Sequence, residues 1–268
     1  APNGDVHICD LNRVDNTIEE TNYSELNASF ETRGFFVDGG NWEFGNGKYI
    51  KTVDFDIKGT DSIEEDAYLN IDNLMVTNGN LNVDGGIKAE LVTISNTEAK
   101  INGYTDVDEF SATNSDINVI DILDTRTILL NNSVIHECNQ VVTDMLTMSN
   151  RAVLEVNNNF CAGSVVMNQS RLVIGPTRLG SAYIGNLLVK SAYARENLGD
   201  YTVQNNANLS VDKIEMTAGT FASFGTQDKT AGTVKAKTVK LKDFIAGEYT
   251  SFICNTFVNT GKATLYNS

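Results

Sequence analysis

Apolar and polar residues alternate in short runs along the chain, and one such run recurs at a fixed interval. Leu74 and Val76 occupy alternate positions ahead of Asn78, and similar apolar pairs precede other asparagines at a constant step. This alternation is typical of a strand that buries one face. The asparagines at the constant step are Asn78, Asn96, Asn114, Asn132, Asn150 and Asn168.

Two further apolar columns share this 18-residue step, one just after the asparagines and one ahead of them. Their members are Leu81, Ala99 and Ile117, and Leu69, Ile87, Leu123 and Val141. Three alternating segments per repeat, separated by Asn, Asp and Gly, predict one coil of a three-sided β-solenoid. We therefore expect an all-β chain with about 18–20 residues per coil and coils stacked at the ~4.8 Å strand spacing.

The asparagine column has a physical reason at the corner between two strands. A corner residue often needs a left-handed conformation, which Asn tolerates better than most residues. An amide that points inward can bond the backbone of its own turn and the amide of the next coil. We expect a buried internal ladder, in which Asn168 is also buried and closed to glycosylation.

The spacing of the aliphatic residues bears on the hand of the coil. Left-handed hexapeptide solenoids have coils of the same length, but they place an aliphatic residue at every sixth position. In this chain, steps of six residues join the columns of Leu69 and Leu81 through a third column midway between them. This third column holds Met75, Thr93, Ser111, Leu129 and Thr147. This mixed column favours a right-handed parallel β-helix.

The asparagine ladder and the near-20-residue coils of residues 50–175 resemble the passenger regions of bacterial autotransporter and two-partner-secreted surface proteins. A more distant resemblance is to the pectate-lyase-like enzymes. The first resemblance implies a secreted or cell-surface β-helix of the adhesin type. It is a likeness of fold, because proteins of unrelated function share asparagine ladders.

The chain divides by pattern into three segments. Residues 1–49 are expected to form an N-terminal cap and the first coils, residues 50–175 the regular solenoid, and residues 176–268 a continuing solenoid with loop excursions. The aromatic-rich stretch 20–49 is interpreted as a cap over the open core, with an aromatic ligand platform as the alternative. Its aromatic residues are Tyr23, Phe30, Phe35, Phe36, Trp42, Phe44 and Tyr49.

The period fails between Ile174 and Asn208, and a loop there is a candidate binding site for a sugar. A loop packed on the solenoid flank is the alternative. Its candidate residues are Arg178, Tyr183, Tyr193, Arg195 and Tyr201. Further on, Val234, Ala236, Val239 and Leu241 alternate with lysines that we interpret as protection of a solvated sheet edge. These lysines are Lys235, Lys237, Lys240 and Lys242.

Charge changes the picture of partners. The net charge of −15 argues against nucleic-acid binding, which usually shows a basic surface. Residues 1–150 carry a net charge of −19 and residues 151–268 carry +4. This asymmetry suggests head-to-tail self-association that weakens as salt rises, while a cap that blocks one end predicts a monomer. No apolar run approaches the ~18 residues of a membrane helix.

Five acidic residues form two neighbouring columns at the 18-residue step. Asp72, Glu90 and Asp108 make one column, and Asp106 and Asp124 make the other. Stacked carboxylates repel one another, and a shared Ca²⁺ ion would relieve them. The alternative is a solvated acidic face that Lys88 and Arg126 neutralise directly.

Other candidate chemistry is sparse. His7 and His136 are the two histidines of the chain, and common catalytic motifs do not occur. Cysteines lack any CxxC pair, so they are buried small hydrophobes or form one or two disulfides; they are Cys9, Cys138, Cys161 and Cys254. Five glycosylation sequons are interpreted as chance products of 32 asparagines; they are Asn22, Asn27, Asn131, Asn168 and Asn208.

These features favour a non-enzymatic protein, secreted or at the cell surface, that acts in adhesion or as a structural subunit. A start at Ala1 without methionine fits a mature secreted chain. The alternative is a carbohydrate-binding or carbohydrate-active β-helix. The expected partners are a cell-surface receptor, a glycan or a second copy of the chain, and no cofactor is expected other than the calcium considered above.

Overall fold

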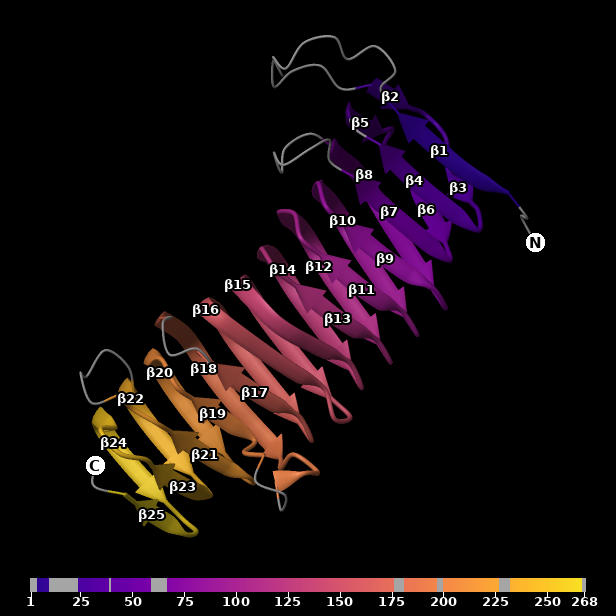
Figure 1. The fold of residues 1–268 in the computed structure, drawn as a ribbon. Helices are drawn as coiled ribbons and strands as arrows, with labels where there is room; N and C mark the ends of the chain where they lie inside the picture. Colours follow the sequence, from indigo (N-terminus) through magenta and orange to yellow (C-terminus); the bar gives the residue numbers. More distant parts are fainter. Residues whose placement is uncertain are drawn as a thin grey trace. The chain divides into compact units, whose positions relative to one another are not determined.

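A computed structural model describes residues 4–9, 24–38, 40–58, 67–175, 181–196, 200–226 and 232–266. The chain is all-β and forms a parallel β-solenoid of about 12 turns (Figure 1), which confirms the predicted fold class. The right hand of the coil and its three-sided section stay predictions. In the described ranges, no helix has the length and apolar character needed to cross a membrane.

The chain separates into two compact units, Ala1–Thr125 and Arg126–Ser268. Unit 1 contains β1 (Asp5–Cys9), β2 (Ser24–Leu26), β3 (Phe30–Glu31), β4 (Gly34–Asp38), β5 (Gly40–Phe44), β6 (Tyr49–Thr52), β7 (Asp54–Lys58), β8 (Ala67–Thr77), β9 (Asn80–Val83), β10 (Gly86–Ser95), β11 (Glu98–Ile101), β12 (Thr105–Thr113) and β13 (Asp116–Val119). The unit boundary falls within β14 (Ile122–Asn131).

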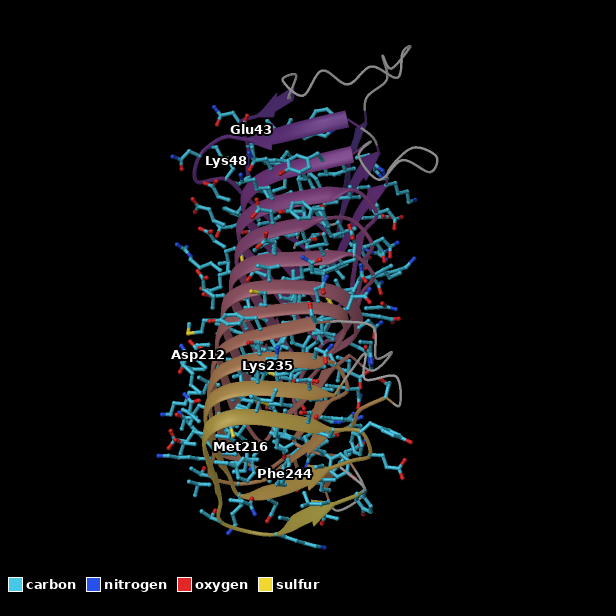
Figure 2. All side chains as sticks on the ribbon, turned by 90° about the vertical axis from the view of Figure 1, so that its left-hand side faces the viewer. Glu43, Lys48, Asp212, Met216, Lys235 and Phe244 are labelled. Carbon is cyan, nitrogen blue, oxygen red and sulfur yellow. The ribbon has the colours of Figure 1, made fainter. Side chains whose placement is uncertain are left out.

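Unit 2 contains β15 (Val134–Ser149), β16 (Val153–Asn168), β17 (Arg171–Ile174), β18 (Ser181–Ser191), β19 (Val203–Asn205), β20 (Asn208–Met216), β21 (Thr220–Ser223), β22 (Thr233–Leu241), β23 (Asp243–Ala246), β24 (Ser251–Asn259) and β25 (Ala263–Leu265). Side chains fill the interior between the strands and project from the outer faces (Figure 2).

Parallel pairing places residues at equivalent positions of successive turns beside one another. In unit 1, β8 pairs with β10 and β10 with β12, so that Leu74, Val92 and Phe110 form one column. All three side chains are buried. The same alternation of buried and outward residues runs along β11 and β13. The period of the sequence is thus the length of one turn.

The corner asparagines have the expected backbone but not the expected burial. Asn78, Asn96 and Asn114 are left-handed, with φ of 59°, 50° and 50°. Their side chains nevertheless face solvent, so the prediction of a buried ladder is wrong. The amides still stack on the outside: Asn96 Nδ2 donates to Asn78 Oδ1 at 3.0 Å, and Asn114 Nδ2 donates to Asn96 Oδ1 at 3.2 Å.

In unit 2 the corner column changes at its end. Asn132 and Asn150 are left-handed, whereas at the next corner Gln169 takes the positive φ in place of Asn168. Asn168 is exposed, which corrects the expectation that it is buried. Corner conformation and outward amide stacking are therefore features of the surface.

The buried polar column at the corners consists of hydroxyl groups one residue after the asparagines. Thr97 N donates to Ser115 Oγ at 3.2 Å, and Ser115 Oγ donates to Thr113 O at 2.9 Å. A short hydroxyl can bond the tight corner backbone from inside. In unit 2 an amide takes such an inward position at Asn205, which is buried and whose Nδ2 donates to Ser223 Oγ at 3.0 Å. Sequence reasoning assigned this inward role to the neighbouring asparagines.

The described part of the aromatic-rich N-terminal segment lies in the first turns of the solenoid, and the cap stays a prediction. Strands β1, β2 and β3 pair with β4, β5 and β6. Phe35 is buried and stacks on Phe55 with ring centroids 6.0 Å apart, and Phe30 and Phe44 pack around it. Tyr23 lies outside the described residues. Phe35 and Phe44 therefore belong to the core, whereas Phe36, Trp42 and Tyr49 are half-buried.

The interval 174–208 is not a single loop. It contains β18, which pairs with β16 and β20, and β19, which pairs with β17 and β21. The core residues Phe160, Ala182 and Leu209 are paired although the intervals between them along the chain are unequal. The number of residues between paired positions of successive turns varies here, while the strand register is retained.

The lysines of residues 235–242 face solvent and alternate with buried Val234, Val239 and Leu241, as expected, whereas Ala236 is half-buried. Their interpretation as edge protection is wrong, because β24 pairs with β22 and covers that edge. The last described strands, β24 and β25, contain no charged residue.

Candidate binding groove

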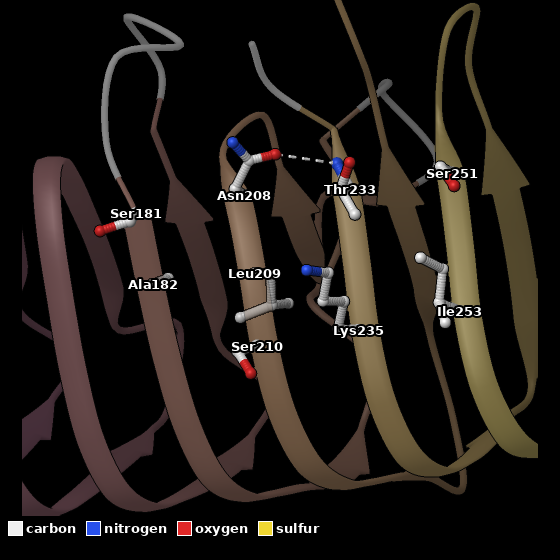
Figure 3. Close-up of a pocket in the computed structure, with 9 residues that line it drawn as sticks. All are labelled: Ser181, Ala182, Asn208, Leu209, Ser210, Thr233, Lys235, Ser251 and Ile253. Carbon is white, nitrogen blue, oxygen red and sulfur yellow. Dashed lines mark hydrogen bonds between the residues drawn. The ribbon is translucent and has the colours of Figure 1, made fainter. Parts of the chain in front are cut away.

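A shallow groove crosses four adjacent strands on the flank of unit 2, β18, β20, β22 and β24 (Figure 3). Its volume is about 610 Å³. The lining residues come from successive turns because parallel pairing brings equivalent positions together. They are Ser181, Ala182, Asn208, Leu209, Ser210, Thr233, Lys235, Ser251 and Ile253.

One wall of the groove is a row of hydroxyl and amide groups at the strand starts. Ser181 pairs with Asn208, and Thr233 pairs with Ser251. Asn208 Oδ1 accepts a hydrogen bond from Thr233 N at 3.3 Å (Figure 3). This row presents donors and acceptors at about the strand spacing of 4.8 Å.

The second row runs along the outer face two residues further on. Tyr183 pairs with Ser210, Ser210 with Lys235, and Lys235 with Ile253. Tyr183 is 44% exposed and Ile253 is 56% exposed. The row therefore combines an aromatic ring, a hydroxyl, an ammonium group and an aliphatic side chain within four turns.

A second ammonium group adjoins this row. Lys237 Nζ lies 2.9 Å from Asp212 Oδ1. The hydrogen bond to Asp212 and the negative charge of that carboxylate raise the pKa of Lys237 above its ordinary value. Lys237 and Asp212 therefore form an ion pair beside the row.

The residues predicted for a binding loop are dispersed. Tyr183 lies on β18 beside the groove, but Tyr193 is buried, and its backbone N–H donates to Thr202 Oγ1 at 2.9 Å. Tyr201 packs against Phe224 with centroids 5.8 Å apart, and Arg195 is exposed. Arg178 lies outside the described residues. Tyr183 is the member of this set that adjoins the groove row.

The acidic columns have protein partners in unit 1. Lys88 Nζ lies 3.8 Å from Asp106 Oδ2, as the direct-neutralisation alternative expected. Tyr104 donates a hydrogen bond to Asp124 Oδ2 at 3.4 Å, and Asp72 accepts one from Gly47 N. Burial raises the pKa of Tyr104, and the charges of Asp124 and Asp106 raise it further.

The remaining pair of acidic positions, Glu90 and Asp108, lies on exposed parts of β10 and β12. Over the residues that the structure describes, no group of three His, Cys, Asp or Glu side chains is arranged to hold a metal ion. Calcium binding by these columns stays a prediction without a preformed site.

Of the other candidate residues, Asn208 lines the groove, and the histidines and cysteines do not. His7 stacks on Phe36 with centroids 4.6 Å apart. Cys138, Cys161 and Cys254 are free thiols, and Cys138 is the buried one of these three. The side chain of Cys9 and the sequon at Asn22 lie outside the described part of the chain. The other sequon asparagines are exposed; they are Asn27, Asn131, Asn168 and Asn208.

Sequence reasoning did not find the groove. Its small polar residues, such as Ser181 and Ser251, have no distinguishing motif, and the intervals between the four strands are unequal. The register of β18 with β20 and β22 brings them together. A search for Ser, Thr or Asn at the first position of every strand would have been the available signal.

Comparison with family models, with curated proteins and with solved structures finds no match to this chain.

Proposed function

We propose that this protein is a non-enzymatic adhesion protein of an extracellular or cell-surface setting, and that the groove of unit 2 binds an acidic glycan. The observation that carries the proposal is the parallel arrangement of the polar row and the Tyr183–Ser210–Lys235–Ile253 row. A linear sugar chain offers hydroxyl groups and apolar ring faces at intervals, and two such rows suit it.

The chemistry favours an anionic ligand. Lys235 lines the groove and supplies its positive charge, whereas the charge of Lys237 is neutralised by Asp212. Sugar carboxylates or sulfates form charge-assisted hydrogen bonds with ammonium groups. Tyr183 supplies an exposed aromatic face, on which the C–H side of a pyranose ring can pack.

The proposal is tested by binding to an array of neutral and acidic glycans. We expect binding to acidic glycans that falls about tenfold or more in a Tyr183→Ala/Lys235→Ala double variant. Lys240→Ala is the matched control, because Lys240 is an exposed lysine of the same strand β22 outside the groove. Equal loss in the control would indicate non-specific charge attraction and contradict the proposal.

A reducing-sugar assay on the bound polysaccharides separates binding from turnover. We expect no product. If the wild type releases product and the Tyr183→Ala/Lys235→Ala variant does not, the adhesion proposal is wrong and the carbohydrate-active alternative is favoured.

A further inference from the structure

The polar row of the groove continues beyond the four strands that line it. Ser181 Oγ on β18 donates a hydrogen bond to Asn159 Oδ1 on β16 at 3.2 Å. Asn159 is exposed, and β16 pairs with β18 in parallel. One polar side chain therefore occupies the same position in five successive turns of unit 2. These residues are Asn159, Ser181, Asn208, Thr233 and Ser251.

The outer row extends to the same turn. Cys161 on β16 pairs with Tyr183, and both side chains are exposed. In each turn the outer-row residue follows the polar one by two positions, so the two rows lie on one face of the strands, about 6.5 Å apart. The side chains between the rows point inward, and Phe160 and Leu209 among them are buried. The outer row consists of Cys161, Tyr183, Ser210, Lys235 and Ile253.

The charge of the two rows is low. Lys235 is the one charged residue of both rows, and the charge of Lys237, two positions further along β22, is neutralised by Asp212. A heavily sulfated chain needs several cationic contacts, and the net charge of −15 on this protein repels it. A ligand with well-separated carboxylates therefore fits these rows better.

The outer row changes in character from turn to turn around its ammonium group. Lys235 lies between Ser210 and Ile253, which are uncharged, and Ile253 is 56% exposed. Two turns before Lys235, Tyr183 presents an aromatic face and a hydroxyl group. An ammonium group suits a carboxylate, whereas an exposed aliphatic side chain suits a methyl group of the ligand. An acidic sugar at Lys235 is therefore best flanked by neutral units.

We propose that the groove binds an internal segment of a linear, unsulfated polysaccharide in which a uronic acid alternates with an N-acetylated amino sugar. The chain lies along the stacked turns, with one sugar unit on each turn from β16 to β24. Two turns span ~10 Å, which matches one disaccharide of an extended chain. The contacts repeat from turn to turn, so they recognise the interior of the chain and no particular chain end. The inference rests on the proposed glycan binding and gives it a ligand class and a direction.

Each outer-row residue has a role in this register. The carboxylates lie two turns apart, where Lys235 donates a charge-assisted hydrogen bond to one and the Tyr183 hydroxyl donates to the other. The neutral units lie at the turns between and beside them. There the Ser210 hydroxyl bonds the acetamido group, and Ile253 packs against its methyl group.

Titration calorimetry with hyaluronan oligosaccharides of different lengths tests the register. We expect the dissociation constant to fall about tenfold or more between the disaccharide and the hexasaccharide, because the longer chain engages Tyr183 and Lys235 together. Beyond the length of the two rows the dissociation constant should change little. Chito-oligosaccharides keep the N-acetyl groups and lack the carboxylate, and heparin oligosaccharides are densely sulfated, so both controls should bind more weakly.

The outcomes separate this inference from the proposed function. Equal dissociation constants for the disaccharide and the hexasaccharide, or tighter binding of either control, overturn the inference. If other acidic glycans of the array bind and hyaluronan does not, the inference is wrong and the proposed function stands. If no acidic glycan binds, the proposed function is wrong as well.

A change at Ile253 tests the contact with the N-acetyl group. Ile253→Ser should raise the dissociation constant of the hyaluronan hexasaccharide about fourfold, because a buried methyl contact is lost. The same variant should bind a hexamer of β-1,4-linked mannuronic acid as the wild type does, since that chain has no N-acetyl group. Val258→Ser is the matched control, because Val258 is exposed on the same strand outside the two rows. Equal loss for both hexamers or in both variants contradicts the assignment.

The exposed thiol of Cys161 reports on how far the ligand extends in the unmodified protein. A saturating hyaluronan decasaccharide should slow alkylation of Cys161 by iodoacetamide severalfold, followed at that residue by mass spectrometry. Met145→Cys is the control, because Met145 is exposed on β15 outside the two rows, and its alkylation should not change. An unprotected Cys161 at saturation, or equal protection of both thiols, overturns the extension of the site to β16.

Discussion

The turns of unit 1 from β8 to β13 and the turns of unit 2 from β18 to β25 reach the same strand pairing from different sequences. In unit 1 the paired core residues Leu74, Val92 and Phe110 follow one another at equal intervals along the chain. In unit 2 the intervals between the paired core residues Ala182, Leu209 and Val234 are longer and unequal. The corners also differ, with Asn96 left-handed in unit 1 and Gly219 in unit 2.

Some features are needed to form a solenoid turn, and others only make the turn recognisable in the sequence. Register within each sheet and a filled inward column are common to both units. A constant period is not, because extra residues between strands leave the ladder intact and cost little loop-closure free energy. The comparison therefore predicts that the two units respond alike to core changes and differently to corner changes.

The largest expected effect is on the core. Phe110→Ala in unit 1 and Phe221→Ala in unit 2 each remove a side chain with 0% exposure. Each should lower the free energy of unfolding by about 3–5 kcal/mol, measured by chemical denaturation. If Phe221→Ala lowers the free energy of unfolding far less than Phe110→Ala does, the core of unit 2 is more loosely packed than that of unit 1.

A smaller loss is expected at a corner of unit 2. Gly219 has φ of 80°, and a Cβ placed there would clash with Thr202 Oγ1. Gly219→Ala combines left-handed strain with crowding, so we expect a loss of about 2–4 kcal/mol. Gly47→Ala is the control, since its φ is 75° but no atom lies within 4 Å of the added Cβ. Equal losses would assign the effect to φ alone.

At a corner of unit 1 the effect should be smaller again. Asn96→Ala keeps the left-handed strain and removes the solvent-exposed amide ladder, and we expect a loss of about 1–2 kcal/mol. Asn96→Gly removes the same ladder but relieves the strain, so its loss should be less. Thermal denaturation of the pair separates the two contributions. If Asn96→Gly lowers stability as much as Asn96→Ala does, the loss of amide stacking accounts for most of the effect.

A surface ion pair of unit 2 should give a small effect that depends on pH. The hydrogen bond and charge of Lys213 lower the pKa of Glu215, with 2.6 Å between Lys213 Nζ and Glu215 Oε2. Its contribution to stability is present above the ordinary glutamate pKa and is lost as pH falls through the lowered value. Glu215→Gln should therefore reduce the melting temperature slightly at pH 7 and not at all in strong acid. A difference that persists in acid would show that the pair does not act through charge.

Calcium should have the smallest effect of all. Asp106 is paired with Lys88 and Asp124 accepts from Tyr104, so the acidic columns of unit 1 already have partners. We expect millimolar Ca²⁺ and EDTA to leave the melting temperature unchanged. An increase with Ca²⁺ that Glu90→Gln/Asp108→Asn abolishes would restore the calcium interpretation.

The fold class was predictable from the sequence. Alternation with period two and the constant step of the asparagines predict stacked parallel turns, and these bury Leu74, Val92 and Phe110 in one column. The sequence also determined the backbone of the corners, because the left-handed conformation limits the choice to Asn and Gly at most such positions.

Which corner residue faces inward depends on the packing of the folded turn. Asn96 and Thr97 are neighbours, and sequence pattern cannot say which of two adjacent polar residues the core accepts. The fold accepts the small Thr97 hydroxyl and leaves the Asn96 amide in solvent. The groove of unit 2 was decided in the same way. Ser181, Asn208 and Thr233 become neighbours through strand register across unequal intervals, and register depends on packing of the whole turn.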